Sequence, residues 1–201
     1  MHQDEHGTWL LAESAVLAGL PQAVTFLVAL PDAPGAGARA WAFWRRLDGP
    51  VWIGPRHTNF QDGSICAFSA DDQAWEEGGD LRTLLDLYSV WVLRHLHLAH
   101  LGRWPGKQYA LLNGHPHLQA YYRLIECRPD ELCGCGSESR RYAECCRPWD
   151  LKRNFTSLAS LFLRHVEGGF SSRRPPDAVT AFLGSSAPLP SMADVHLQLR
   201  R

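Results

Sequence analysis

The stretch that decides the fold spans residues 24–30 and has the sequence VTFLVAL, an unbroken run of apolar and β-branched residues. Residues of these types favour β-strands, and the turn-forming sequence PDAPG at residues 31–35 ends the run. Large and small side chains then alternate through residues 38–47, which predicts a second strand, and an Asp-Gly turn follows it. Residues 51–53 predict a short third strand. This part of the chain is therefore predicted to contain three successive strands.

Periodic apolar residues predict helices before and after these strands. The clearest helix begins after Asp80, which can cap it, and ends at Gly102. Between the third strand and Asp80 the pattern is irregular and rich in Gly, Asp and Pro, which is typical of a long functional loop. The expected helices are residues 8–18, 81–101, 116–126 and 157–166.

The composition indicates a folded chain with no bias toward nucleic acid. Of the 201 residues, 45% are apolar, which is enough for a core, and the formal net charge is −1. The first residues, MHQDE, are polar and acidic, and the apolar stretches are too short to cross a bilayer, which needs about 20 residues. We therefore expect a cytoplasmic protein with no membrane partner. In that compartment the six cysteines are expected to be metal ligands or catalytic thiols before disulfides.

The irregular loop contains the sequence HTNFQDGSIC at residues 57–66. Cys66 carries a thiol, a side chain that forms thioesters readily, and Asn59 lies seven residues before it. An asparagine amide can donate a hydrogen bond to the oxyanion that develops when a carbonyl is attacked, and one such donor contributes about 3 kcal/mol. The residue types alone leave the commoner alternative open, in which Cys66 is a small buried apolar residue and His-x-Asn forms a turn.

The same segment resembles the active-site loop of ubiquitin-conjugating enzymes, and the resemblance extends over residues 8–102. His57-Thr58-Asn59 stands where the family has His-Pro-Asn. Gly63-Ser64-Ile65-Cys66 matches its Gly-x-Ile-Cys, and Trp75 precedes the long helix as a tryptophan does in the family. Thr58 replaces the family's proline, the loop that follows is one residue shorter, and the predicted meander falls short of the family's four strands.

The resemblance implies an α+β fold for residues 1–112, in which an antiparallel meander is flanked by helices. It implies that Cys66 accepts a ubiquitin-like protein as a thioester from an activating enzyme and transfers it to a protein target. Asn59 would stabilise the oxyanion, and His57 would hold the loop in shape. The sequence GRWPG at residues 102–106 resembles the divergent bacterial branch of the family. Members of that branch are encoded beside an activating enzyme and a ubiquitin-like protein, often in anti-phage defence.

Four further thiols lie close together in the sequence CGCGSESRRYAECC at residues 133–146. Zinc binds four soft ligands in a tetrahedron, and two pairs of cysteines joined by a short loop supply them. The stretch resembles the SEC-C zinc motif, with one additional residue at Glu138-Ser139. The alternative is that the cysteines form two unrelated thiol pairs or vicinal disulfides. Because four cysteines leave no ligand position open, the expected zinc is structural. The expected ligands are Cys133, Cys135, Cys145 and Cys146.

Residues 113–170 are thus expected to form a helical extension with this zinc motif, and residues 171–201 a loosely held tail. Several arginines make the extension locally basic, and such a surface could bind an acidic protein or RNA. The simpler interpretation is a solvent-exposed charged surface, and nucleic acid is not an expected partner.

The leading prediction is a conjugating enzyme. Its general base stays open, because Asp71 and Asp72 could approach Cys66 or simply cap the loop. The alternative is a catalytically inactive relative with the same fold that acts as an adaptor or binding protein. A third alternative, a small nucleic-acid-binding zinc protein, rests only on the basic residues of the extension.

Overall fold

The computed structural model describes residues 1–15, 23–33, 35–68, 72–108, 115–166, 173–185 and 187–193 of the chain. The chain divides into two compact units. Residues 1–93 and 170–201 form the first, which we call the sheet unit, and residues 94–169 form the second, which we call the cysteine unit. We expected boundaries at residues 112 and 170. The first division falls earlier, inside a helix at residues 93–94, whereas the second lies at residues 169–170, next to the expected boundary. The residues after it group with the strands.

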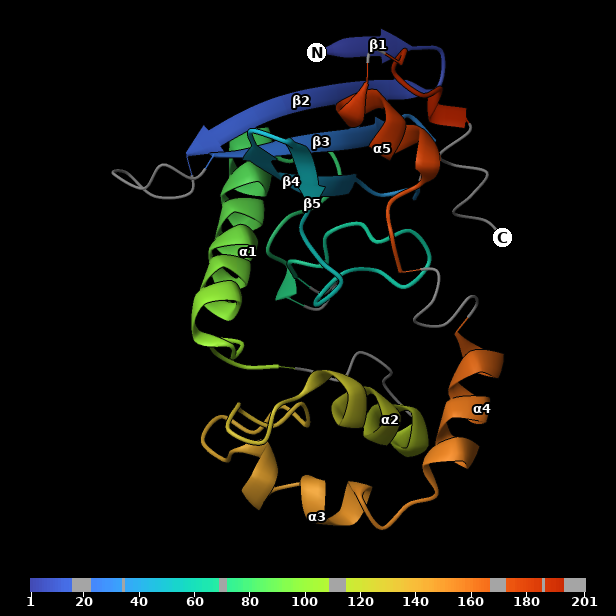
Figure 1. Cartoon of the computed structure of the whole chain (residues 1–201). Helices are drawn as coiled ribbons and strands as arrows, with labels where there is room; N and C mark the ends of the chain where they lie inside the picture. Colours follow the sequence, from blue (N-terminus) through green and yellow to red (C-terminus); the bar gives the residue numbers. More distant parts are fainter. Residues whose placement is uncertain are drawn as a thin grey trace. The chain divides into compact units, whose positions relative to one another are not determined.

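The sheet unit is built on five strands that neighbour one another in the order of the sequence (Figure 1). They are β1 (His2–Asp4), β2 (Gly7–Ala15), β3 (Ala23–Pro31), β4 (Arg39–Arg46) and β5 (Gly49–Trp52). Each strand pairs antiparallel with the next. The strands predicted at residues 24–30, 38–47 and 51–53 are confirmed as β3, β4 and β5, with β5 beginning earlier than expected. The α+β class is confirmed as well.

The helix predicted at residues 8–18 is wrong for the residues that the structure describes, because residues 7–15 form β2. This strand pairs with β3 along its full length and buries Trp9 in the core. The helical propensity of its Leu and Ala residues is therefore overridden by pairing with a distant segment. Residues 16–18 of that prediction lie outside the described part of the chain.

One face of the sheet packs against α1 (Leu81–Leu101), the predicted long helix. The ring of Phe26 in β3 lies 6.2 Å from the ring of Tyr88 in this helix. The predicted cap is also present, since Oδ1 of Asp80 accepts a hydrogen bond from the N–H of Arg82 at 3.1 Å. No described helix, α1 included, has the length and apolar character needed to cross a bilayer.

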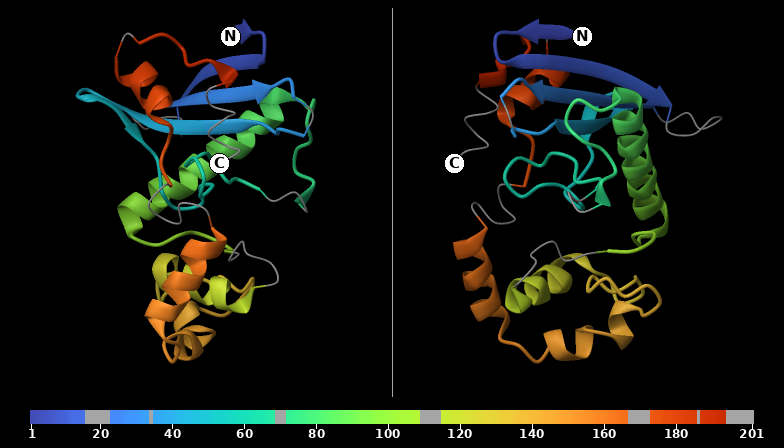
Figure 2. Two further views of the ribbon diagram at one scale, coloured as in Figure 1. Left: turned by 90° about the vertical axis from the view of Figure 1, so that its right-hand side faces the viewer. Right: turned by 180° about the vertical axis from the view of Figure 1, so that it is seen from behind.

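The opposite face of the sheet packs against α5 (Asp177–Gly184), which comes from the C-terminal part of the chain (Figures 1 and 2). Leu27 of β3 faces this side because neighbouring side chains along a strand point to opposite faces. It belongs to one buried cluster with Val179 and Met192. Residues 171–201, which we expected to form a loosely held tail, thus contribute core residues in their described part.

The cysteine unit contains three helices besides the end of α1. They are α2 (Pro116–Glu126), α3 (Arg147–Asp150) and α4 (Phe155–His165). The ring of Tyr121 in α2 lies 5.3 Å from that of Phe155 and 5.0 Å from that of Phe162, so α2 and α4 pack through aromatic contacts. The helices predicted at residues 116–126 and 157–166 are confirmed as α2 and α4.

Candidate functional site

The predicted active-site loop, residues 57–66, is a short hairpin, which we call the Cys66 hairpin. The backbone N–H of Cys66 donates to the carbonyl of His57 at 3.0 Å, and that of Asn59 donates to the carbonyl of Ser64 at 2.8 Å. His57 and Cys66 therefore lie opposite each other on the two arms, and Asn59 lies on the same arm as His57. The fold brings the three predicted catalytic residues together on one small element.

Two buried tryptophans attach the Cys66 hairpin to the rest of the sheet unit. The indole N–H of Trp41 in β4 donates to the carbonyl of Asp62 at 2.8 Å, and that of Trp91 in α1 donates to the carbonyl of His57 at 2.7 Å. His57 has a φ of 49°, and its carbonyl receives both Trp91 and the N–H of Cys66. The backbone of His57 thus sets the position of Cys66 relative to α1. Neither tryptophan was predicted to belong to the site.

The side chain of Asn59 lies against the backbone just before Cys66. Its Nδ2 donates to the hydroxyl of Ser64 at 2.9 Å and lies 3.5 Å from the carbonyl oxygen of Ile65. The hydroxyl of Ser64 in turn donates to Oδ1 of the buried Asp62 at 2.7 Å. This chain of hydrogen bonds fixes the amide against the residues just before Cys66. Sequence reasoning missed Asp62 and Ser64, although Asp-x-Ser spacing is typical of a turn closed by a side chain.

Arg173, from the expected tail, binds the arm of the Cys66 hairpin that carries Thr58. Its Nε donates to the carbonyl oxygen and to the hydroxyl oxygen of Thr58, at 3.1 and 3.0 Å. Its guanidinium carbon lies 4.5 Å from the centre of the Phe60 ring. The hydroxyl of Thr58 donates to the carbonyl of Pro55 at 2.6 Å. The threonine that replaces the proline of the conjugating enzymes therefore supplies a hydroxyl that binds Arg173.

Arg173→Met is expected to destabilise the sheet unit by about 1–3 kcal/mol, because it removes a donor that two buried oxygens of Thr58 share. A lower midpoint of urea denaturation and faster amide hydrogen exchange in residues 57–66 would show this. Arg174→Met is the matched control, since Arg174 is exposed. Equal exchange rates in Arg173→Met and the parent would contradict the assignment.

The thiol of Cys66 is partly buried, and burial raises its pKa. The positive charges of Arg173 and Arg39 oppose this rise in pKa, and the negative charge of Asp72 adds to it. Cys66 is therefore a neutral thiol at neutral pH. Asp72 acts on the thiol through its charge, and its role as a base stays a prediction. Asp71 lies outside the described residues.

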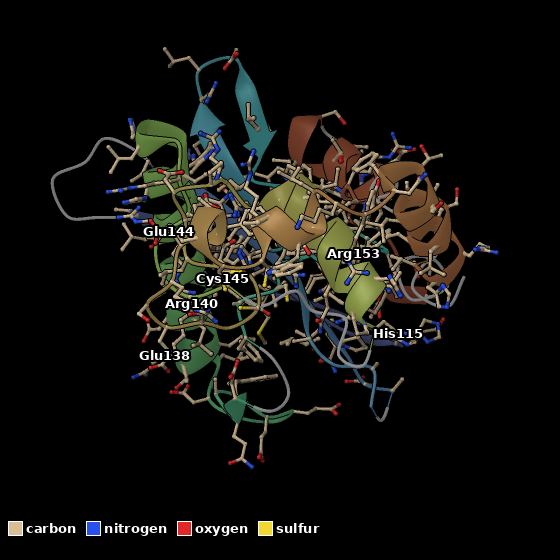
Figure 3. The ribbon with its side chains drawn as sticks, turned by 90° about the horizontal axis from the view of Figure 1, so that it is seen from below. His115, Glu138, Arg140, Glu144, Cys145 and Arg153 are labelled. Atoms are coloured by element: carbon tan, nitrogen blue, oxygen red, sulfur yellow. The ribbon has the colours of Figure 1, made fainter. Side chains whose placement is uncertain are left out.

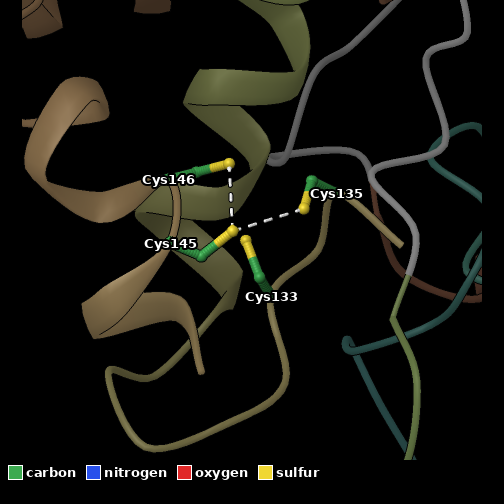
Figure 4. Close-up of side chains that lie close together, drawn as sticks. All are labelled: Cys133, Cys135, Cys145 and Cys146. Atoms are coloured by element: carbon green, nitrogen blue, oxygen red, sulfur yellow. Dashed lines mark hydrogen bonds between the residues drawn. The ribbon is translucent and has the colours of Figure 1, made fainter. Parts of the chain in front are cut away.

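In the cysteine unit, the sulfur atoms of Cys133, Cys135, Cys145 and Cys146 all lie within 4.8 Å of one another (Figure 4). The sulfur of Cys145 is 3.7 Å from that of Cys135 and 3.9 Å from that of Cys146. A disulfide bond is about 2.05 Å long, so these pairs are not disulfides. We call the four residues the cysteine cluster.

The geometry of the cysteine cluster fits a tetrahedral metal site. Four Zn–S bonds of about 2.3 Å would place neighbouring sulfurs about 3.8 Å apart. The short 3₁₀ helix η2 (Tyr142–Glu144) leads into the second pair, and the N–H of Cys145 donates to the carbonyl of Tyr142 at 3.2 Å. The first pair is held by the N–H of Cys133, which donates to the carbonyl of Arg140 at 3.0 Å. The four cysteines can therefore hold a metal ion.

Burial raises the pKa of Cys145 and Cys146, and the neighbouring thiol of Cys133 raises both further. A bound cation reverses such shifts, because it favours the thiolate form, so metal binding and deprotonation are coupled. Cys127 is buried close to the cluster but does not belong to the ligand set. It is the C-cap residue of α2.

The loop between the two cysteine pairs carries charge on its exposed side. Glu138, Arg140 and Glu144 are exposed and belong to the same segment as Cys145 (Figure 3). Glu138 forms an ion pair with Lys107. The part of the loop that is longer than the SEC-C pattern therefore makes its contact outside the ligand set.

Comparison of the chain with known protein families, with curated proteins and with solved structures finds no match. The chemistry of the site is therefore argued from its own residues.

Proposed function

We propose that the chain is a conjugating enzyme of the ubiquitin type, which carries a ubiquitin-like protein as a thioester on Cys66, and that the cysteine cluster holds a structural zinc ion. The observation that carries the enzymatic part is the Cys66 hairpin, which has the partly buried thiol of Cys66 on one arm and the amide of Asn59 on the other. Support also comes from the order of elements, with successive antiparallel strands before the hairpin and α1 after it. The N-terminal helix that the resemblance implies is replaced by β2.

Two acyl transfers make up the proposed reaction. In the first, the sulfur of Cys66 attacks the thioester carbonyl on the activating enzyme. A new C–S bond forms, the old one breaks, and the proton of Cys66 passes to the departing thiolate. In the second, an amine of the target attacks the same carbonyl, Cys66 leaves as a thiolate, and the proton that the amine gives up passes to that thiolate.

Each transfer passes through an oxyanion, and the amide of Asn59 is the donor we propose for it. This amide makes a good hydrogen bond with Ser64 at 2.9 Å and a long contact with the carbonyl of Ile65 at 3.5 Å. A contact of that length is weak, so the amide can exchange it for a stronger bond to a charged oxygen at little cost. The bond to Ser64 keeps the amide in place meanwhile.

The test is the formation of the thioester by the full chain. The chain is incubated with ATP, a ubiquitin-like protein and its activating enzyme. An adduct is expected on a non-reducing gel, it should disappear on treatment with a thiol, and peptide mapping should locate it at Cys66. Absence of the adduct, or an adduct that resists thiols, would argue against the enzyme.

Asn59→Ala is expected to slow transfer from Cys66 to free lysine by about 100-fold, because one oxyanion donor is lost. Formation of the thioester should be reduced less than its discharge, since the thiol itself is intact. Discharge is measured in a single turnover after the activating enzyme is quenched. Gln61→Ala, an exposed change in the same hairpin, is the control. Equal discharge rates in Asn59→Ala and the parent would remove Asn59 from the mechanism.

The second candidate function is an inactive relative that binds the same partners as an adaptor. It is favoured by the engagement of the Asn59 amide within the hairpin and by the raised pKa of Cys66. In that case the chain forms no adduct but still binds the ubiquitin-like protein in a pull-down with purified components.

A further inference from the structure

The side chain of Arg123, which comes from α2, lies beside the cysteine cluster in a nearly solvent-free position. Its Nε and Nη2 donate to the two carboxylate oxygens of Asp150, each at 2.8 Å. The side chains are 8% and 2% exposed, respectively. The hydroxyl of Tyr142 donates to Oδ2 of Asp150 at 3.1 Å, so the carboxylate is held from two sides. A buried ion pair of this kind is costly to desolvate, which makes stability alone a weak reason for it.

Three observations connect Arg123 with the cysteine cluster. Tyr142 and Asp150 bracket the second ligand pair along the chain, three residues before Cys145 and four after Cys146. The stem of Arg123 lies against the backbone between the first pair, since a Cβ placed on Gly134 would come 3.1 Å from its Cγ. Burial works against the charge of Arg123, but Asp150, Cys146 and Cys133 raise its pKa, so the guanidinium stays charged near the sulfurs.

The charge of the loaded site explains why a cation is needed there. A divalent metal with four thiolates carries two net negative charges, and the hydrophobic cluster in contact with the cysteines, which includes Cys127 and Tyr142, offers no positive charge to offset them. A fixed positive charge lowers the cost of holding that negative charge away from water. Asp150 keeps the guanidinium in place, and the hydroxyl of Tyr142 holds Asp150 through its hydrogen bond.

We propose that Arg123 is a positioning residue of the metal centre, whose positive charge stabilises the thiolate ligands and raises the affinity of the cysteine cluster for zinc. The inference rests on the proposed zinc site. It adds a residue outside the ligand set, and it gives the buried pair with Asp150 a role beyond packing. Partners of metal ligands commonly change metal affinity by about 10- to 100-fold.

The experiment compares zinc affinity in full-length variants by competition with a chromogenic chelator at pH 7. Arg123→Met combined with Asp150→Asn removes both charges without leaving an unpaired one, and is expected to weaken zinc binding at least about tenfold. Arg123→Lys keeps the charge and loses the paired hydrogen bonds, and is expected to stay within about threefold of the parent. Cobalt absorption bands should be those of a four-sulfur tetrahedral site in every variant that binds.

Three outcomes would overturn the proposal. Zinc affinity in the double variant equal to that of the parent would show that the charge has no effect. A loss of about tenfold or more in Arg123→Lys, measured against the parent, would show that only the paired hydrogen bonds matter, and this measurement still decides if the double variant fails to fold. A parent chain that binds no zinc would instead remove the metal centre itself. The failure of the Arg123 proposal alone is thereby distinguished from the failure of the site.

Discussion

Cys66→Ala is expected to abolish the thioester adduct, and Cys66→Ser is expected to convert it into an adduct that resists thiols. Alanine offers no nucleophile, whereas a serine oxygen forms an ester that reducing agents do not cleave. Both variants should keep the fold, because Cys66 is only partly buried and its side chain is small. The measurement is the gel assay with and without reducing agent, accompanied by the thermal denaturation midpoint of each variant.

Cys127→Ala provides the matched control for this prediction. It removes another thiol from the same chain, one that is buried in the cysteine unit and belongs to neither proposed site. Its adduct should form at the parental rate. An adduct that survives in Cys66→Ala and maps to a different cysteine would transfer the chemistry to that residue and refute the assignment of Cys66.

Cys133→Ser combined with Cys146→Ser is expected to reduce the metal content from about one zinc ion per chain to none and to unfold the cysteine unit. Structural zinc contributes about 10–16 kcal/mol of binding free energy that is also folding free energy. The hydrophobic cluster that contacts the four cysteines is small, with Cys127 and Tyr142 as its other buried members. Metal analysis measures the loss of zinc, and limited proteolysis measures the unfolding of the cysteine unit. The sheet unit should remain resistant to protease.

The same cysteine-to-serine change at Cys127 is the control for the metal prediction. Cys127→Ser alters a buried thiol outside the ligand set, so the metal content should stay at the parental value. A freshly purified parent without metal, or a double variant that keeps its metal, would count against the zinc site.

The elements that the sequence predicted correctly are those whose signals are local. Turn-forming residues mark the end of the apolar run at residues 24–30, and Pro116 marks the start of its helix. Both elements were therefore predicted. β2 was mistaken for a helix because residues 8–15 contain no local signal of their pairing with β3. Its strand conformation depends on a neighbour that only the folded sheet provides.

The same distinction applies to the candidate sites. The cysteine spacing predicted a cluster that the structure brings together. The pattern around Cys66 predicted an irregular loop, and the hydrogen bonds that close it into a hairpin were not predicted. Arg173 could not be found in this way, since it meets Thr58 across 115 residues of sequence. Arg123 was missed for a similar reason, because its partner Asp150 lies on another helix.

The contact between Arg173 and Thr58 can form only late in synthesis, because Arg173 is added 115 residues after Thr58. The cysteine unit is an insertion within the sheet unit, because the chain passes into it within α1 and returns to supply residues 173–193. A ribosome therefore adds all four residues of the cysteine cluster before it adds Arg173, which contacts the Cys66 hairpin. A nascent or truncated chain that ends before residue 173 has Cys66 but lacks that contact.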